Sequence, residues 1–320
     1  MLGGRRPSIA VVLLTYRPDT AGFDACLASV LASPGHDRVV VVDNGQSLDR
    51  AAVDRVVGAG GPAATVDLVT TEENLGFAGG MNAGITHALE HGADAVAVLN
   101  DDTEVEPGWL DALSAHLEDE RVGAVQPKLL LDRPGGGATR EPVIASVGMR
   151  VRDDGAGIDL GFGEVDRGQY AQAVGIDLFT GGAVLLTAPF LVDVGGFDER
   201  YFLYYEDIDL ARRGRERGWR YLVEPGAVVH HAMSSTASTL PGMHRYWQER
   251  NRLWWLFRHG SPYQVVRGLL LSLLRLAKHP IRSQATAIRD GVAGAPWCWR
   301  ERRRRPTVTP LPVAVRWTVH

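Results

Sequence analysis

The sequence predicts an α/β fold with a mainly parallel sheet flanked by helices. In the N-terminal third, short apolar segments typical of buried strands alternate with segments that have the periodicity of helices. Polar residues follow the carboxyl end of each apolar segment, as expected where parallel strands end at a ligand-binding edge. Right-handed crossovers would join such strands. We therefore expect a doubly wound, Rossmann-like sheet.

Four short apolar segments carry the strand prediction. Each is bounded by polar or turn-forming residues. The segments are Ser8–Leu14, Val39–Val42, Val66–Thr70 and Ala95–Leu99, and helical spacing is seen at Asp24–Ala32 and Ile85–Glu90. Beyond them we expect a helix over Pro107–Glu118, strands at Val122–Gln126 and Val228–His231, and a surface insertion at Ser146–Arg152 and Gly161–Asp166.

Length and composition describe an ordinary globular protein. The 320 residues suffice for one large α/β domain with an appendage, and 45% are hydrophobic while 22% are charged. Cys26 and Cys298 show no metal-ligand spacing and indicate a reducing compartment. The apolar run Ile9–Leu14 is too short for a signal-peptide core, and no run reaches membrane-spanning length. We therefore expect a cytoplasmic protein.

Charge is distributed unevenly along the chain. Residues 261–320 contain eleven Lys and Arg against Asp290 and Glu301, a net +9, and the whole chain carries −4, so the other residues carry −13. Within this basic region, Val265–Leu276 is strongly apolar and includes two arginines. Such a helix suits the interface of an anionic membrane. The alternative is a helix packed on the main domain, followed by a disordered basic tail. Nucleic acid is not an expected partner, because no recognition motif appears.

The fourth apolar segment runs directly into Asn100-Asp101-Asp102. Ligands of open α/β sheets bind outside the carboxyl ends of the strands. Two carboxylates there suit a hard divalent cation, which in turn suits a diphosphate. A turn that merely uses aspartate is the alternative. At another predicted strand end, His230 and His231 offer an imidazole that could complete a metal shell or serve a structural role.

Two other segments point to a ligand at the same edge. The glycine-rich stretch 74–84 matches neither a dinucleotide fingerprint nor a P-loop, yet its glycines let the backbone approach a ligand at a helix start. A tight loop that needs small residues for packing is the alternative. Asp43 ends the second strand, where a carboxylate can bind a base or a ribose hydroxyl, or cap the next turn.

A cluster of carboxylates follows an aromatic stretch further along the chain. Glu206, Asp207 and Asp209 come directly after the aromatic residues at 201–205. Asp207 or Glu206 falls in the first turn of a helix, where the helix dipole alone favours acids. The aromatic neighbours would also desolvate a carboxylate and raise its pKa toward the range of a general base.

Taken together, these motifs resemble glycosyltransferase family 2. The resemblance implies an inverting enzyme with the GT-A fold, and it is strongest to bacterial rhamnosyltransferases that act on polyprenyl-diphosphate-linked acceptors. It extends in consistent order over about residues 8–257 and is carried by Thr15-Tyr16, Val42–Gly45, Asn74–Asn82, Leu99–Thr103, Gly195–Asp198, Glu206–Leu210 and His230-His231.

The resemblance assigns the central chemistry to a few acidic residues. Asp207 matches the position of the catalytic base, and Glu206 stands beside it. Asp102 matches the position of a metal ligand, and the implied cofactor is Mg²⁺ or Mn²⁺. Asp101 stands where the family usually has proline.

The remaining assignments concern the metal histidine and the two substrates. His230 fits the metal histidine of the family better than His231, because Ser235 then falls at the expected spacing. The nucleotide-sugar would contact Thr15, Tyr16, Asp43, Asn74, Gly76, Phe77, Gly79, Asn82, Asn100 and Asp101, and the acceptor would contact Gly181, Gly182 and Asp209.

The implied function is transfer of a sugar from a nucleotide-diphosphate donor to a cell-envelope glycan or lipid-linked acceptor at the inner face of the membrane. The expected donor is dTDP-L-rhamnose. A UDP-linked galactofuranose or hexose is an alternative, as is a non-catalytic, membrane-associated protein that binds nucleotide-sugars. A nucleotidyltransferase would need a glycine-rich loop after the first strand, where Thr15–Pro18 has no glycine.

The expected domain organisation follows from this function. Residues 1–258 would form the catalytic domain, with a nucleotide-sugar half over about 8–127 and an acceptor half over about 128–258. Residues 259–320 would form a basic, amphipathic helical extension and tail.

Overall fold

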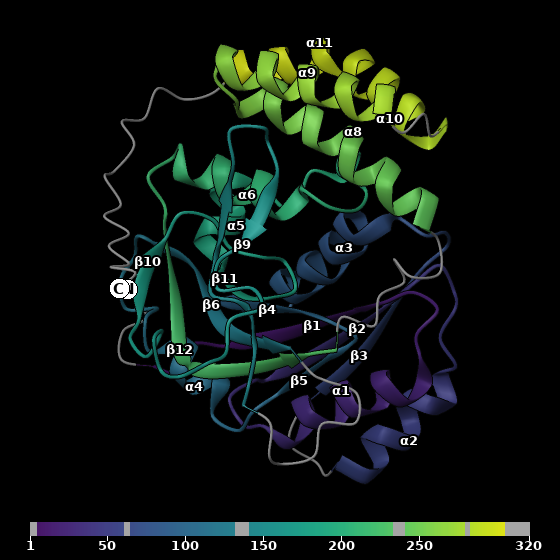
Figure 1. Ribbon diagram of the computed structural model, residues 1–320. Helices are drawn as coiled ribbons and strands as arrows, with labels where there is room; N and C mark the ends of the chain where they lie inside the picture. The colour runs from purple at the N-terminus through teal and green to yellow at the C-terminus, as the bar shows by residue number, and fades with distance from the viewer. Residues whose placement is uncertain (1–4, 61–64, 132–140, 233–240, 279–281, 305–320) are drawn as a thin grey trace.

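A computed structural model describes residues 5–60, 65–131, 141–232, 241–278 and 282–304, which form a mixed sheet with helices on both faces (Figure 1). Ser235 lies outside the described residues. The four predicted strands are present and parallel, which confirms the α/β fold. They are β1 (Ile9–Thr15), β2 (Arg38–Asn44), β3 (Thr65–Thr71) and β4 (Ala95–Asn100).

The other half of the sheet mixes strand directions. β11 (Ala183–Thr187) runs antiparallel to β4 and to β6 (Val122–Leu131), and β12 (Arg220–His231) runs parallel to β6. The full order is β10-β12-β6-β11-β4-β1-β2-β3. Short strands complete this half: β10 (Val174–Ile176) and β5 (Thr103–Val105) pair with β12, and β7 (Ile144–Ser146) pairs with β6.

The register of the central strands brings their carboxyl ends to one edge. Thr15 of β1 pairs with Asp43 of β2, and Leu14 pairs with Asn100 of β4. Across the sheet, His231 at the end of β12 pairs with Thr103 of β5, which directly follows Asp102. Residues that are distant in sequence therefore meet at this edge.

Each face of the sheet is buried by its own set of helices. Along β1, Val11 and Leu13 pack with Phe23 in one core, whereas Val12 and Leu14 belong to the core on the opposite face. This burial of both faces explains the continuous apolar segments in the sequence. The first core lies under α1 (Thr20–Ala32), α2 (Arg50–Gly60) and α4 (Trp109–Ser114), and the second under α3 (Gly76–Glu90), α5 (Ala188–Val194) and α6 (Glu206–Arg215).

Most of the glycine-rich stretch is helix, although we expected a loop over 74–84. α3 begins at Gly76, and two of its glycines, Gly80 and Gly84, face the sheet. A Cβ atom at Gly80 would collide with the side chain of Leu14, and one at Gly84 would collide with that of Val12. Close packing of α3 on β1 therefore requires these two glycines, which supports the packing alternative.

Four C-terminal helices lie over α3, α5 and α6 on the second face (Figure 1). They are α8 (Pro241–His259), α9 (Pro262–Lys278), α10 (Arg282–Ala293) and α11 (Ala295–Arg303). α8 ends beside the predicted boundary at residue 258, and the division into domains stays a prediction. Cys26 and Cys298 are both free and buried. Within the described residues, no helix combines the length and the apolar character needed to cross a bilayer.

Candidate active site

The first carboxylate after β4 turns toward β1. The hydroxyl of Thr15 donates a 2.6 Å hydrogen bond to Oδ2 of Asp101. Burial raises the pKa of Asp101 to about 6, and the bond from Thr15 opposes this shift. Asp101, which departs from the family pattern, is thus anchored to the neighbouring strand.

Asp102 faces the end of β12 and meets one of the two histidines there. Nε2 of His231 lies 3.0 Å from Oδ1 of Asp102 and 3.4 Å from the side-chain nitrogen Nδ2 of Asn100. Nε2 of His230 instead lies 2.9 Å from Oε1 of Glu106. Neighbouring side chains of a strand point to opposite faces, so only one histidine can reach Asp102. The structure places His231 there, whereas the sequence led us to expect His230.

The pair of Asp102 and His231 fits a divalent cation that is also held by a diphosphate. Among the residues that the structure describes, no group of three or more His, Cys, Asp or Glu side chains could hold a metal by itself. Mg²⁺ is commonly bound by one or two carboxylates together with substrate phosphates and water. An imidazole beside the carboxylate suits Mn²⁺ equally, because imidazole is a common ligand of transition metals.

Asp207 lies in the first turn of α6, where backbone amides hold both of its oxygens. Oδ2 accepts a 2.9 Å hydrogen bond from the amide of Gly181, and Oδ1 accepts a 2.7 Å bond from that of Ile208. Burial raises the pKa of Asp207, although these bonds oppose the shift. A fixed carboxylate with a raised pKa suits a general base.

A two-glycine segment joins this carboxylate to the histidine. A Cβ atom at Gly181 would lie 3.3 Å from the Cβ of Asp207 and 3.2 Å from the ring of Phe77. One at Gly182 would lie 3.4 Å from the ring of His231. The carbonyl of Gly182 also accepts a 3.1 Å hydrogen bond from the amide of Asn100. The metal-binding candidates and the candidate base therefore belong to one site.

Glu206 is a buried acid beside Asp207. Its Oε2 atom is inaccessible and has no hydrogen-bond partner in the described part of the chain. Burial, helped by the charge of Asp207, raises its pKa well above the usual value. A carboxyl group in such surroundings favours the neutral form.

A further carboxylate, that of Asp159, comes near Asp207 from a hairpin of β8 (Met149–Val151) and β9 (Gly157–Asp159). Burial raises the pKa of Asp159 to about 6, a hydrogen bond with Ser146 opposes this, and the charge of Asp207 adds to it. A surface insertion was expected at Ser146–Arg152 and Gly161–Asp166, and β9 lies between these two ranges. An Asp154-Gly155 turn signal marks the hairpin, but nothing in the sequence indicates which way it folds.

The expected nucleoside residues lie at the strand edge. Oδ1 of Asp43 accepts hydrogen bonds from the amides of Ser47 (2.7 Å) and Leu48 (3.1 Å), so one carboxylate oxygen caps the following turn. Tyr16 is half-buried at this edge, with the guanidinium of Arg17 5.3 Å from its ring.

The residues before and at the start of α3 hold one another in place. Oδ1 of Asn74 accepts a 2.8 Å hydrogen bond from the backbone amide of Gly76 and a 3.1 Å hydrogen bond from the side-chain nitrogen Nδ2 of Asn44. Gly79 packs against Leu75, where an added Cβ atom would lie 2.7 Å from the leucine Cβ. These contacts shape the helix start that faces the strand edge.

Asn82 lies elsewhere than expected for a nucleotide-sugar ligand. Its Oδ1 accepts a 2.9 Å hydrogen bond from the amide of Phe197, and its Nδ2 donates 2.9 Å bonds to the carbonyl of Phe197 and to Glu199. The side-chain amide thus joins α3 to the segment before α6, and its contact with the donor stays a prediction.

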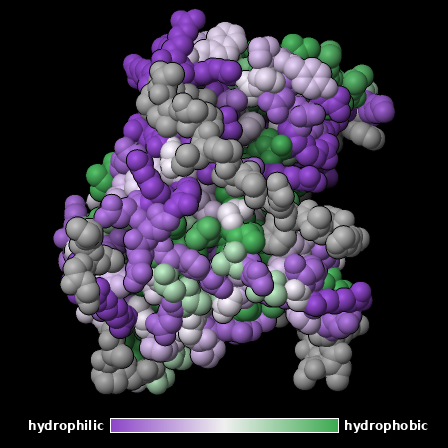
Figure 2. Space-filling model, turned by 90° about the vertical axis from the view of Figure 1, so that its left-hand side faces the viewer, coloured by the Kyte–Doolittle hydropathy of each residue, from purple (hydrophilic) through white to green (hydrophobic). Residues whose placement is uncertain are grey.

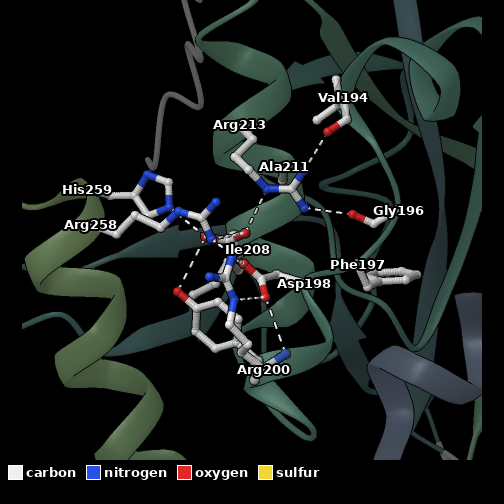
Figure 3. Close-up of polar contacts among 12 residues, drawn as sticks. Val194, Gly196, Phe197, Asp198, Arg200, Ile208, Ala211, Arg213, Arg258 and His259 are labelled. Carbon is white, nitrogen blue, oxygen red and sulfur yellow. Dashed lines mark hydrogen bonds and ion pairs between the residues drawn. The ribbon is translucent and has the colours of Figure 1, made fainter. Parts of the chain in front are cut away.

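Asp209 also differs from the acceptor-binding role expected of it. It is fully buried and accepts hydrogen bonds from Arg213 (2.8 Å) and Arg258 (2.9 Å), while Nε2 of His259 lies 2.7 Å away. Burial raises its pKa, but these cationic neighbours lower it far below the usual value. Figure 3 shows Arg213 directed at the carbonyls of Val194 and Gly196 as well. Asp209 therefore joins α6 to α8 inside the protein.

Comparisons with known proteins identify the family of this chain. Residues 7–254 match the model of the family described as "Glycosyltransferase like family 2". An N-acetylglucosaminyl-diphospho-decaprenol L-rhamnosyltransferase of Mycobacterium tuberculosis is 31% identical over 278 residues, which cover 77% of this chain and 86% of that protein. A pre-mycofactocin glycosyltransferase of the same species is 28% identical over 194 residues, which cover 61% of this chain and 37% of that protein.

Solved structures share the fold. GalNAc-T7, solved with UDP, GalNAc and Mn²⁺, superimposes with a TM-score of 0.60 at 13% identity, covering 93% of this chain, which spans 57% of the length of that structure. The mannosyltransferase PcManGT of Pyrobaculum calidifontis, solved with GDP-Man and Mn²⁺, gives a TM-score of 0.52 at 17% identity and covers 94% of this chain and 85% of the other. The fold is thus GT-A-like. The chain belongs to glycosyltransferase family 2 and is a nucleotide-sugar glycosyltransferase.

Proposed function

We propose that the protein inverts the sugar configuration in a single metal-dependent displacement, with Asp207 as the general base. The observation that carries this proposal is the position of Asp207. Its carboxylate is partly buried, has a raised pKa and accepts a hydrogen bond from the amide of Gly181, which is followed by Gly182 beside His231. One base is sufficient for a single displacement, because no covalent intermediate has to be formed and resolved.

The residues divide the reaction between them. Asp207 takes the proton of an acceptor hydroxyl as that oxygen bonds to the anomeric carbon, and the bond from this carbon to the diphosphate breaks. Asp102 and His231 would hold a Mg²⁺ or Mn²⁺ ion, which supplies positive charge for the leaving diphosphate when bound. Burial and the charge of Asp207 raise the pKa of Glu206, and this shift disfavours a second negative charge beside Asp207.

The proposed donor is dTDP-L-rhamnose. The support is the rhamnosyltransferase of M. tuberculosis, which shares 31% of aligned residues with this chain. UDP-galactofuranose, or a UDP-hexose, is the alternative donor. A non-catalytic nucleotide-sugar binding protein is disfavoured because Asp102 and Asp207 are both present.

A donor screen tests this proposal. The melting temperature of the purified protein is measured in Mn²⁺ with dTDP-rhamnose and, separately, with UDP-sugars. The donor that raises the melting temperature is then incubated with the protein and a polyprenyl-diphosphate-linked sugar, and turnover is measured. We expect stabilisation by dTDP-rhamnose and release of dTDP that requires both metal and acceptor. Stabilisation by UDP-sugars alone would favour the alternative donor, and binding without any turnover would contradict an enzyme.

We also propose that α9 docks on an anionic membrane, where a lipid-linked acceptor would reside. Apolar side chains spaced three or four residues apart form one exposed stripe of α9, and Arg267 and Lys278 are exposed beside it. Figure 2 shows apolar surface next to strongly hydrophilic surface over the C-terminal helices. Basic charge and an exposed apolar stripe together suit anionic phospholipids. The stripe comprises Tyr263, Val266, Leu270, Leu273 and Leu274, which are 55–62% exposed.

Vesicle binding tests this membrane proposal. The protein should sediment with vesicles that contain phosphatidylglycerol and much less with pure phosphatidylcholine. A Leu270→Glu/Leu274→Glu double variant should lose this binding, whereas Val192→Glu should keep it, because Val192 is 78% exposed on α5, away from the stripe. Equal sedimentation of the double variant and the wild type would overturn the proposal.

A further inference from the structure

The loop at residues 202–205, which leads into α6, has an unfavourable backbone conformation. Phe202, Tyr204 and Tyr205 have φ values of 66°, 69° and 74°, which residues with a side chain rarely adopt. Phe202 is the centre of a γ-turn, because the amide of Leu203 donates a 2.8 Å hydrogen bond to the carbonyl of Tyr201. Such conformations persist only where the surroundings enforce them.

One side chain of α8 supplies the restraint. Asn251 is fully buried, and its Nδ2 atom lies 2.9, 2.8 and 2.7 Å from the carbonyl oxygens of Tyr201, Leu203 and Tyr204. Its Oδ1 atom accepts a 2.8 Å hydrogen bond from Nε of Arg250, which fixes the amide in this orientation. The side-chain amide of Asn251 thus contacts two carbonyls of the loop and the carbonyl of Tyr201, which precedes it.

The neighbour of Asn251 is itself firmly held. The guanidinium of Arg250 lies 4.2 Å from the ring centre of Trp247 and 3.9 Å from that of Trp254. Its Nη2 atom also donates hydrogen bonds to the carbonyls of Arg200 (3.0 Å) and Tyr201 (2.8 Å). The segment before α6 is therefore bound to a rigid part of α8.

The opposite side of the loop rests on α3. The carbonyl of Phe202 accepts a 3.2 Å hydrogen bond from the amide of Ala78, and a Cβ atom at Gly76 would collide with that carbonyl. The loop is thus enclosed between the start of α3 and α8. It ends at Tyr205, which precedes α6 without a side-chain cap, and Asp207 follows two residues later.

We propose that Asn251 is a positioning residue for Asp207. By donating hydrogen bonds to the carbonyls of Tyr201, Leu203 and Tyr204, it fixes where α6 begins. It thereby fixes where the carboxylate of Asp207 meets the acceptor. The C-terminal helix α8 is then a working part of the catalytic centre. This proposal rests on the proposed role of Asp207 as the base.

Steady-state kinetics on the full chain test the proposal. Asn251→Asp removes both donors and brings negative charge toward three carbonyl oxygens. We expect kcat to fall by about 100-fold, as for a small misplacement of a reacting group. The donor KM should stay close to that of the wild type, because the metal-binding and nucleotide-binding residues are untouched.

Ser272→Ala is the matched control. Ser272 is fully buried between α8 and α9, where its hydroxyl contacts Arg252 and Glu249 and does not touch the loop. This variant should keep the kcat of the wild type even if it melts at a lower temperature. A folded Asn251→Asp protein with the kcat of the wild type would overturn the proposal.

Two further variants cover the case in which Asn251→Asp does not fold. Asn251→Ser retains one hydrogen-bond donor, and we expect it to lower kcat by less than Asn251→Asp would. Unchanged kcat in a folded Asn251→Ser protein would overturn the proposal. In an Asp207→Asn background, Asn251→Ser should leave the residual rate unchanged, and a further fall would mean that Asn251 acts elsewhere. Full activity of Asp207→Asn alone would instead overturn the proposed base.

Discussion

Nε2 of His231 lies 3.0 Å from the carboxylate of Asp102, and this contact joins the end of β12 to the turn after β4. It arises because His231 pairs with Thr103 in the ladder between β12 and β5. The ladder thus decides which of two adjacent histidines faces the proposed metal.

Replacing His231 with alanine should weaken the metal dependence of the enzyme. We expect the Mn²⁺ concentration for half-maximal activity to rise roughly tenfold or more, because a group that binds or orients the metal is lost. Activity measured across a Mn²⁺ titration checks this. His230→Ala is the control and should give the titration of the wild type, since His230 pairs with Glu106. The reverse order of effects would return the role to His230.

The pH dependence of the reaction should report on Asp207. A base must be deprotonated, so kcat/KM should fall as the pH falls through the pKa of Asp207. Burial raises this pKa. We therefore expect kcat/KM to fall at a higher pH than it would with an ordinary aspartate, whose pKa is about 3.9. Asp207→Asn should lower kcat by about 10²–10⁴-fold while donor affinity in calorimetry is preserved. A flat profile down to pH 4 would contradict this role.

Glu206→Gln should keep most of the activity. Burial raises the pKa of Glu206 and so favours its neutral form, which glutamine imitates. Turnover at pH 7 measures the effect. A loss comparable to that of Asp207→Asn would show instead that Glu206 exchanges a proton during the reaction.

Asp159→Asn should affect the acceptor more than the donor. We expect the KM for the acceptor to rise about tenfold, the size of one lost hydrogen bond to a charged group, with little change in donor binding. Asp153→Asn is the matched control, because Asp153 is exposed in the turn of the same hairpin. Equal acceptor KM values for the two variants would show that Asp159, although near Asp207, does not contact the acceptor.

Arg258→Met should destabilise the protein by about 3–5 kcal/mol, because it takes one cation from the fully buried carboxylate of Asp209. Urea unfolding measures this. Asp119→Asn breaks an exposed ion pair with Arg220 and should change stability by less than about 1 kcal/mol. Since the pKa of Asp209 is lowered on folding, the stabilisation is present above about pH 4 and is lost in more acidic solution. Equal losses of unfolding free energy for the two variants would contradict a stabilising role of the buried cluster around Asp209.

The parallel half of the sheet could be predicted because local signals and tertiary packing agree there. The strand at Ile9–Thr15 is apolar on both faces, and both faces are buried. The start of α3 could not be predicted in the same way, because glycine is a poor helix former. Gly80 and Gly84 are helical for the sake of contacts with β1, which local sequence does not reveal.

The candidate site was predicted where it depends on strand ends and missed where it depends on distant contacts. Asp102 and Asp207 follow motifs, and they lie in one site. The choice between His230 and His231 depends on which face of β12 turns inward, which only the ladder with β5 determines. The sequence around Asn251 and Asp159 does not indicate the roles proposed for them. These roles depend on tertiary contacts: Asn251 of α8 contacts the carbonyl of Tyr204, and the hairpin brings Asp159 near Asp207.

The ion cluster around Asp209 also limits how the molecule can be trimmed or recombined. The family match ends at residue 254, yet Arg258 and His259, which lie beyond it, complete the partners of a carboxylate buried in α6. A fragment cut at the family boundary would leave that carboxylate short of two neighbours. An exchange of catalytic cores between relatives would therefore have to carry the whole of α8 with it.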